Sequence, residues 1–262
     1  MLELYHWEPN TFSLKPLIAL HEKGLEFASR YVDFLNFEQY ALAPMKTAVE
    51  VQNNPEGEGP ILVNRGVAMT ESFFINIYLD EAFPERPLRP ASAEGRWRVL
   101  MWGRFVNEVL APAVSTLGCH KYLAPALKNR NRADVERAIA RISVKESRDG
   151  WTAALDDSYS GELLDDSRRK IGIGIKKVED ALASAEWLAG KDFSLADIDV
   201  FALLHPVPGL APDLLNARVA PRTWAWLGRI AQRASVKAAL ATAKTAKPHE
   251  CFAPGPEHSR WG

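Results

Sequence analysis

The stretch GEGPILVNRGVAMTES, residues 57–72, indicates most about the fold. Two short apolar runs flank the turn residues Asn-Arg-Gly at 64–66, a pattern typical of a β-hairpin. Pro60 precedes the first run, and an X-Pro bond in a tight turn is the least costly place for a cis peptide. Glu71 and Ser72 follow the second run, where apolar residues begin to recur at helical spacing. The stretch therefore predicts a hairpin that leads directly into a helix.

Strand and helix signals also alternate before the hairpin. LELYHW (2–7) and LEFASRYVDF (25–34) have the patterns of short strands. FSLKPLIALHEKG (12–24) has helical apolar spacing and ends at a glycine. FEQYALAPMKTAVEVQNNP (37–55) is irregular, with room for a short helix. The predicted order is β-α-β-(α)-β-β-α, a small mixed sheet with helices, over residues 1–83.

The chain changes character after residue 83. PERPLRPAS (84–92) contains three prolines and indicates a linker. Apolar residues then recur every three or four positions through 93–247, which predicts an all-α helix bundle. Residues 248–262 have no periodicity and are expected to form a loose C-terminal tail.

Composition excludes several classes of function. Lys+Arg number 32 and Asp+Glu 33, so the net charge of −1 gives no electrostatic basis for binding nucleic acid or an anionic membrane surface. No apolar run approaches the roughly 18–20 residues of a membrane span. The N-terminus resembles no export signal, and the two cysteines are far apart and lack metal-ligand spacing. We therefore expect a cytoplasmic protein without a metal site.

Two interpretations of the proline remain open. Pro60 would turn the backbone of Gly59 outward, so that its N–H and C=O can pair with an extended peptide as an added strand does. The alternative is a simple turn before an edge strand.

The Glu71-Ser72 pair also has two interpretations. The free N–H groups of the helix start attract a carboxylate, and Glu71 can pair with an ammonium. Together they would hold both ends of an amino-acid zwitterion. The alternative is that Ser72 only caps its helix and Glu71 is solvated.

A third feature is HWEPNTFSLKP (6–16), between the first strand and the first helix. A thiol bound there would have its thiolate stabilised by the helix dipole and by a hydrogen-bond donor. Ser13, Thr11 and Asn10 are the candidates, and each has helix capping as its alternative. The three features together would surround a small peptide that carries one thiol.

This combination resembles the glutathione transferase fold, a thioredoxin-like domain followed by an all-helical domain, over nearly the whole chain except the tail. NPEGEGPIL (54–62) resembles the family's Asn-Pro-x-Gly-x-Val-Pro-x-Leu pattern, with Pro60 on its cis-proline. TES (70–72) falls on its γ-glutamyl-binding pair. FSLADIDVF (193–201) resembles its buried capping motif, in which Ser194 is the N-cap and Asp197 the N3 residue.

A closer likeness lies in SLKPLIALHEKGLEFASRYVDFLNFEQ (13–39). It resembles the N-terminal region of bacterial glutathione-dependent β-etherases, which cleave β-aryl ether bonds in lignin-derived aromatics. The resemblance implies that Ser13 is the hydroxyl near the glutathione sulfur. It also implies the residues that hold the tripeptide: Gln39, the backbone of Gly59 beside Pro60, Glu71, Ser72 and, for the glycine end, Lys46.

The implied reaction is a nucleophilic displacement. Glutathione thiolate attacks the carbon that bears the aryl ether, next to a ketone, and a phenol leaves. The aromatic ether would lie against the first helices after the linker. The residues implied for that pocket are Phe12, Trp102, Phe105, Asn107, Ser115, Cys119, His120 and Tyr122. The alternative for the aromatic residues is core packing.

Three departures from the family pattern cluster around the expected glutathione site. Residue 59 is glycine where the family usually has valine, Phe12 replaces a small polar residue, and the segment 40–52 is longer. They keep two alternatives open: a non-catalytic or weakly catalytic subunit of a heterodimer, and a general detoxifying transferase. A bare binding module for hydrophobic ligands is a further alternative. The resemblance implies a dimer, either a homodimer or a heterodimer with a paralogous transferase.

Overall fold

A computed structural model describes residues 1–40 and 59–255. Its first part contains the predicted elements in the predicted order: β1 (Leu2–His6), α1 (Thr11–Lys23), β2 (Phe27–Tyr31), β3 (Ile61–Asn64), β4 (Val67–Met69) and α3 (Ser72–Ala82). Two short 3-10 turns, η1 (Phe34–Asn36) and η2 (Glu38–Tyr40), follow β2. The short helix expected within 37–55 falls largely outside the described residues.

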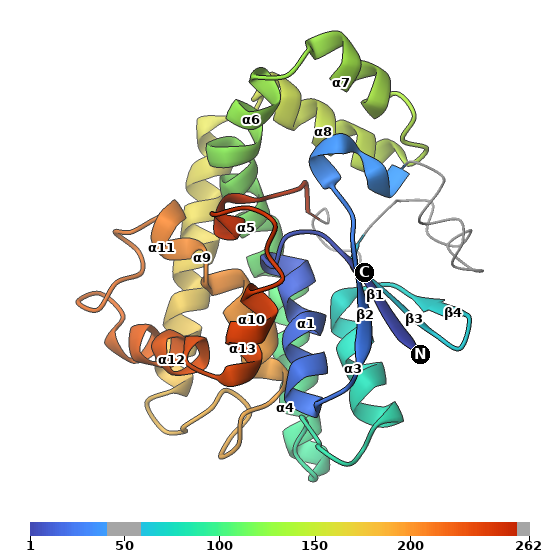
Figure 1. The fold of residues 1–262 in the computed structure, drawn as a ribbon. Helices are drawn as coiled ribbons and strands as arrows, with labels where there is room; N and C mark the ends of the chain where they lie inside the picture. Colours follow the sequence, from blue (N-terminus) through green and yellow to red (C-terminus); the bar gives the residue numbers. More distant parts are fainter. Residues whose placement is uncertain (41–58, 256–262) are drawn as a thin grey trace.

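The four strands form one mixed sheet in the order β2-β1-β3-β4. β1 runs parallel to β2 and antiparallel to β3, and β3 and β4 form the predicted hairpin. Arg65 and Gly66 have φ of 52° and 82°, the left-handed conformation that a tight hairpin turn requires. In Figure 1, α1 lies between the sheet and the helices of the C-terminal half. Both domains therefore bury α1.

The second half is all helical, as predicted. A nearly continuous helical run contains α4 (Ala93–Phe105), η4 (Val106–Leu110), α5 (Ala111–Gly118), η5 (Cys119–Leu123) and α6 (Ala124–Lys128). The remaining elements are α7 (Arg132–Ile139), α8 (Lys145–Asp156), α9 (Gly161–Ala181), α10 (Leu195–Leu204), α11 (Val207–Leu210), α12 (Pro221–Ala231), α13 (Ala234–Leu240) and η6 (Pro248–Glu250). η4 and η5 are π-helical turns just before Pro112 and Pro125. Proline has no backbone N–H and cannot donate a helical hydrogen bond, which accounts for the altered turns.

Helix α10 forms the centre of this half, and every residue from Leu195 to Leu204 is buried. Asp197 Oδ2 accepts hydrogen bonds from the N–H and the hydroxyl of Ser194, both at 3.0 Å. Its Oδ1 accepts from the Leu188 N–H and from Trp226 Nε1, also at 3.0 Å. The predicted N-cap and N3 residues are confirmed by these contacts.

The C-terminal segment differs from the expected loose tail. Phe252 is only 2 % exposed. Its ring fills a notch over Gly118, where an added Cβ would meet the ring at 2.1 Å. Asn10 Nδ2 donates to the Cys251 carbonyl at 2.9 Å, and the Glu8 carboxylate accepts from the backbone N–H of Lys244. Residues 248–255 are thus packed against both domains, whereas 256–262 lie outside the described residues.

No helix within residues 1–40 and 59–255 is long and apolar enough to cross a membrane.

Candidate functional site

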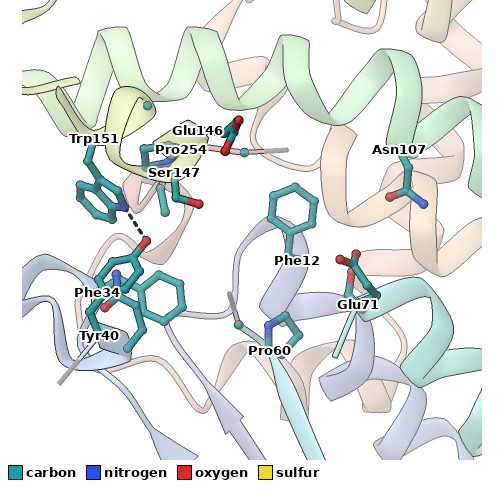
Figure 2. A pocket seen from close by; sticks show the side chains of 16 residues that line it. Phe12, Phe34, Tyr40, Pro60, Glu71, Asn107, Glu146, Ser147, Trp151 and Pro254 are labelled. Carbon is teal, nitrogen blue, oxygen red and sulfur yellow. Dashed lines mark hydrogen bonds between the residues drawn. The ribbon is translucent and has the colours of Figure 1, made fainter. Parts of the chain in front are cut away.

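A cavity of about 130 Å³ lies where the sheet domain, the helical domain and the C-terminal segment meet. Figure 2 shows Phe12 near its middle, Pro60 and Glu71 on one side, and Tyr40 and Trp151 on another. Its described lining residues are Phe12, Phe34, Gln39, Tyr40, Gly59, Pro60, Glu71, Ser72, Asn107, Glu146, Ser147, Gly150, Trp151, Ala253, Pro254 and Gly255. We call it the first cavity.

One end of the first cavity is polar and is built by residues that the sequence predicted. The Gly59-Pro60 peptide bond is cis, immediately before β3. Gln39 is 4 % exposed, and its Oε1 has no hydrogen-bond partner among the described residues. The structure therefore brings Gln39, Pro60, Glu71 and Ser72 around one space, with an acceptor atom left for a ligand.

The start of α3 differs by one residue from the prediction that Ser72 is its N-cap. Glu71 occupies the N-cap position, its carbonyl accepts from the Ile75 N–H at 2.9 Å, and Ser72 is the first helical residue. Glu71 has φ 64° and ψ 101°, a conformation that is costly for a residue with a Cβ. Glu71 and Ser72 both line the first cavity, and the first N–H groups of a helix such as α3 have no partner within the helix.

Glycine at position 59 has a physical cause in this chain. An added Cβ would lie 2.7 Å from Cζ of Phe34, so the phenyl ring occupies the space that a valine would need. Phe34 in turn stacks on Trp7, with ring centroids 5.2 Å apart and planes 8° from parallel. Sequence reasoning did not single out Phe34, because its contact with Gly59 crosses 25 residues of chain.

The opposite end of the first cavity is aromatic. Trp151 Nε1 donates to the Tyr40 hydroxyl at 3.0 Å and so joins α8 to η2 across the domain boundary. The ring of Phe37 packs on Trp151 at 4.7 Å between centroids. Phe12 at the start of α1 faces the same space, as the sequence predicted. The rings of Phe12, Tyr40 and Trp151 provide a surface suited to an aromatic ligand, and Phe37 supports Trp151 from behind the lining.

The three thiol-binding candidates lie at the start of α1 but outside the lining of the first cavity. Ser13 Oγ accepts a hydrogen bond from the Trp7 N–H at 3.2 Å. Asn10 uses its Nδ2 on Cys251, and its buried Oδ1 has no partner among the described residues. Thr11 is buried with φ 41°. Their assignment to the sulfur site stays a prediction.

The residues expected to hold the aromatic substrate separate into groups. Phe12 and Asn107 line the first cavity, whereas Ser115 and Cys119 line a second cavity, described below. Lys46 lies outside the described residues.

Four other expected pocket residues contact protein instead of either cavity. Trp102 Nε1 donates to the Leu188 carbonyl at 3.1 Å, and the Lys177 ammonium lies over the rings of Trp102 and Phe105. His120 Nδ1 lies 2.8 Å from Asp157 Oδ1. Tyr122 stacks on Phe252, with its hydroxyl 3.3 Å from the Gly209 carbonyl. These four therefore have structural partners.

Several lining residues were missed from the sequence: Phe34, Tyr40, Glu146, Ser147, Gly150, Trp151 and the segment 253–255. The aromatic and proline residues of the tail were a signal that it packs, but they carry no periodicity. Within the described ranges, no group of three His, Cys, Asp or Glu residues is arranged to hold a metal ion.

Comparisons with known proteins identify the family. Residues 1–81 match the family model of the glutathione S-transferase N-terminal domain, and residues 143–234 match that of the C-terminal domain. Protein LigF of Sphingobium sp. (strain NBRC 103272 / SYK-6) is 34% identical over 242 residues, which cover 90% of this chain and 91% of LigF. This chain belongs to the glutathione S-transferase family. The crystal structure of beta-etherase LigF superposes with a TM-score of 0.85, at 33% identity over 92% of this chain and 99% of that one.

More distant glutathione S-transferases share the fold. Glutathione transferase F7 of Populus trichocarpa has a TM-score of 0.69 at 22% identity, over 92% of this chain and 98% of its own. A sulfitobacter homologue with bound glutathione has a TM-score of 0.62 at 21% identity, with the same coverage. Glutathione is the co-substrate of the family. The unpartnered Gln39 Oε1 and the Glu71-Ser72 end of the first cavity fit such a zwitterionic peptide.

Proposed function

We propose that this glutathione S-transferase cleaves β-aryl ether ketones with the thiolate of glutathione, as a β-etherase. The proposal is supported by its 34% identity to LigF, whose solved structure is described as a beta-etherase. The observation that carries it is a single cavity with the polar Glu71-Ser72 end facing the rings of Phe12 and Trp151. A peptide and an aromatic compound can therefore meet there.

The polar end holds the tripeptide. The Glu71 carboxylate pairs with the γ-glutamyl ammonium, and the first N–H groups of α3 with its carboxylate. The backbone of Gly59 pairs with the cysteinyl unit, and Gln39 Oε1 accepts an N–H of the peptide. Lys46 remains the proposed partner of the glycine carboxylate.

The start of α1 stabilises the thiolate. The N-terminal end of a helix favours negative charge, and a hydroxyl that donates to the sulfur lowers the pKa of the thiol further. Ser13 is the first choice because Trp7 N–H uses only a lone pair of its oxygen, which leaves the hydroxyl proton available. Thr11 and Asn10 are the alternatives.

The reaction balances as a substitution. The sulfur forms a bond to the carbon next to the ketone, and the ether carbon–oxygen bond breaks with its electron pair on the oxygen. The thiol proton ends on that oxygen, so the products are a glutathione thioether and a phenol. The protein contributes alignment of sulfur, carbon and leaving oxygen, and a low thiol pKa.

The direct test is incubation of the purified chain with glutathione and a β-aryl ether ketone. We expect equal amounts of phenol and thioether to form. Ser13→Ala should lower kcat/KM by about 100-fold and raise the thiol pKa in the pH profile. If the chain shows no affinity for millimolar glutathione, the catalytic proposal fails and the non-catalytic subunit is favoured. If it binds glutathione but uses only unrelated electrophiles, the detoxifying alternative is favoured.

We also propose that two copies of this chain form a homodimer through α4. Trp97, Leu100 and Met101 are exposed there by 58 %, 48 % and 39 %, at helical spacing that places them on one face. Light scattering should give twice the chain mass of 29.2 kDa, and Trp97→Glu should halve it. A monomer that dimerises only with a paralogous transferase would support the heterodimer.

We propose the cytoplasm as its location. Cys119 and Cys251 are both free thiols, which suits a reducing compartment. Cell fractionation with an antibody to the chain tests this.

A further inference from the structure

The second cavity lies behind the C-terminal segment and has a volume of about 360 Å³. Its walls come from α5, η5, α8, the start of α9 and the C-terminal segment. The described lining residues are Pro112, Ser115, Thr116, Cys119, Gly150, Ala153, Tyr159, Leu163, Pro254 and Gly255. Gly150, Pro254 and Gly255 also line the first cavity, so the two spaces meet at this wall.

The second cavity is electrically neutral along its described lining. None of the lining residues is Asp, Glu, Lys, Arg or His. Burial raises the pKa of the Cys119 thiol to about 12 and also raises the pKa of the Tyr159 hydroxyl, so both are protonated at neutral pH. An ionised ligand would lose its hydration there without gaining a counter-charge.

Two polar groups nevertheless point to a ligand with a hydroxyl. Ser115 is 3 % exposed, and its Oγ has no hydrogen-bond partner among the described residues. Native structures seldom leave a buried hydroxyl unpaired. The Tyr159 hydroxyl hydrogen-bonds to the Cys119 sulfur, which still leaves lone pairs on the tyrosine oxygen. The Ser115 hydroxyl can therefore donate a hydrogen bond to the oxygen of a ligand hydroxyl, and the Tyr159 oxygen can accept a hydrogen bond from that hydroxyl.

We infer that the second cavity binds a neutral phenol, with the ring among Pro112, Ala153 and Leu163 and the hydroxyl between Ser115 and Tyr159. This inference rests on the proposed function, because a phenol is the leaving group of the ether cleavage. The aryl group departs from the first cavity past Gly150 and Pro254, and the second cavity holds it. The site would thus select neutral aryl leaving groups and be the place of product inhibition.

Calorimetric titration of the chain with phenol tests the site directly. S-methylglutathione is kept in excess to occupy the first cavity, and benzoate, the same ring with a carboxylate, is the matched probe. We expect saturable binding of one phenol per chain, at least about tenfold tighter than benzoate. If phenol binds without S-methylglutathione but not in its presence, phenol occupies the first cavity and the inference is overturned. Phenol binding that does not saturate would also overturn it.

Variants locate the phenol. Ala153→Phe fills the second cavity without touching the first, and should weaken phenol binding at least about tenfold. Thr152→Phe, at an exposed position on the same helix, is the matched control and should leave it unchanged. Ser115→Ala should weaken it about fivefold through the lost hydrogen bond. If Ala153→Phe does not fold, Leu163→Trp fills the same space from α9. Unchanged phenol affinity in a folded cavity-filling variant would overturn the inference.

The outcomes for this site and for the proposed function are separable. Phenol binding that Ala153→Phe abolishes, in a chain that cleaves no aryl ether, leaves the site standing and removes the β-etherase activity. If the chain cleaves an aryl ether but neither binds phenol nor is inhibited by it, the β-etherase activity stands and the phenol site is overturned.

Discussion

Lys15 Nζ of α1 lies 2.5 Å from Asp199 Oδ1 of α10, and both side chains are fully buried where the two domains meet. Burial raises the pKa of Asp199, while the Lys15 ammonium acts in the opposite direction. The same ammonium lies 5.4 Å from the ring centroid of Phe12, which lines the first cavity. The pair therefore connects the domain interface to the aromatic end of the site.

Removal of one partner of this pair should be costly. Lys15→Met leaves the Asp199 carboxylate buried without a counter-charge, so we expect a loss of about 3–5 kcal/mol in the free energy of unfolding. Urea denaturation measures it. The double variant Lys15→Met with Asp199→Leu should recover much of the loss, because the unpaired charge is then gone. A single variant as stable as the wild type would contradict the interaction.

Glu22 provides a second link between the domains, and its effect depends on pH. Burial alone would raise the pKa of Glu22, but hydrogen bonds from Arg233 and Ser235 outweigh burial and hold the pKa below 4.5. A carboxyl whose pKa is lower in the folded state stabilises the fold above its unfolded pKa, and this stability is lost as the pH falls through the folded value. Glu22→Gln should cost about 1–2 kcal/mol at pH 7.

Denaturation at several pH values checks this prediction. The stability difference between the wild type and Glu22→Gln should be constant near neutrality and shrink once the pH falls below about 4.5. A difference that grows in acid would contradict the assigned direction of the pKa shift.

The strained backbone of Glu71 allows its effect on stability and its effect on glutathione binding to be measured separately. At φ 64° a Cβ is unfavourable, so Glu71→Gly should be more stable than Glu71→Ala by about 1–2 kcal/mol. Both variants should weaken glutathione binding at least about tenfold, because the carboxylate is absent. Thermal unfolding and calorimetry measure the two effects.

Arg65 is the matched control for Glu71. It has φ 52° in the hairpin turn, is exposed, and does not line the first cavity. Arg65→Gly should likewise be more stable than Arg65→Ala, with glutathione affinity unchanged. If Glu71→Ala binds glutathione as tightly as the wild type, Glu71 has no part in the site.

Position 59 can be tested together with Phe34. Gly59→Ala places a methyl group 2.7 Å from the Phe34 ring and should cost about 1–3 kcal/mol. In a Phe34→Leu background the smaller, flexible side chain can move aside, so Gly59→Ala should cost less stability there than in the wild type. A double-mutant cycle in urea measures the coupling. Additive costs would mean that the ring and residue 59 do not compete for space.

Most of the fold could be predicted from local sequence patterns. The Asn-Arg-Gly turn and the hydrogen bonds between Ser194 and Asp197 could be predicted because each joins residues within four positions of each other, whereas the bonds from Leu188 and Trp226 to Asp197 are not local. The residues of the polar end were implied by the family resemblance, and the pairs Gly59-Pro60 and Glu71-Ser72 lie at the two ends of a single hairpin. Ser72 was placed one residue off because Glu71 adopts a conformation that few non-glycine residues adopt.

The aromatic end depends on contacts between distant parts of the chain. Tyr40 and Trp151 are 111 residues apart, and no local pattern links them. The family resemblance implied that Trp102 and Phe105 line the pocket, with core packing as the alternative, and the Lys177 ammonium lies over both rings. Helical periodicity indicates that a face is buried, but it does not say whether protein or ligand covers it.

The C-terminal segment supplies the last prediction. Phe252 anchors it over Gly118, and residues 253–255 form the wall between the two cavities. Phe252→Ala removes about 3–5 kcal/mol of packing, which should release the segment while the rest of the fold remains. Limited proteolysis with trypsin should then cut after Lys244 at least about tenfold faster than in the wild type. Trp224→Ala, at an exposed aromatic on α12, is the control and should be cut at the wild-type rate.

In Phe252→Ala, phenol and benzoate should also lose their difference in affinity, because the wall that closes the neutral second cavity is gone. Equal cleavage of Phe252→Ala and the wild type would mean that the buried ring does not hold the segment in place.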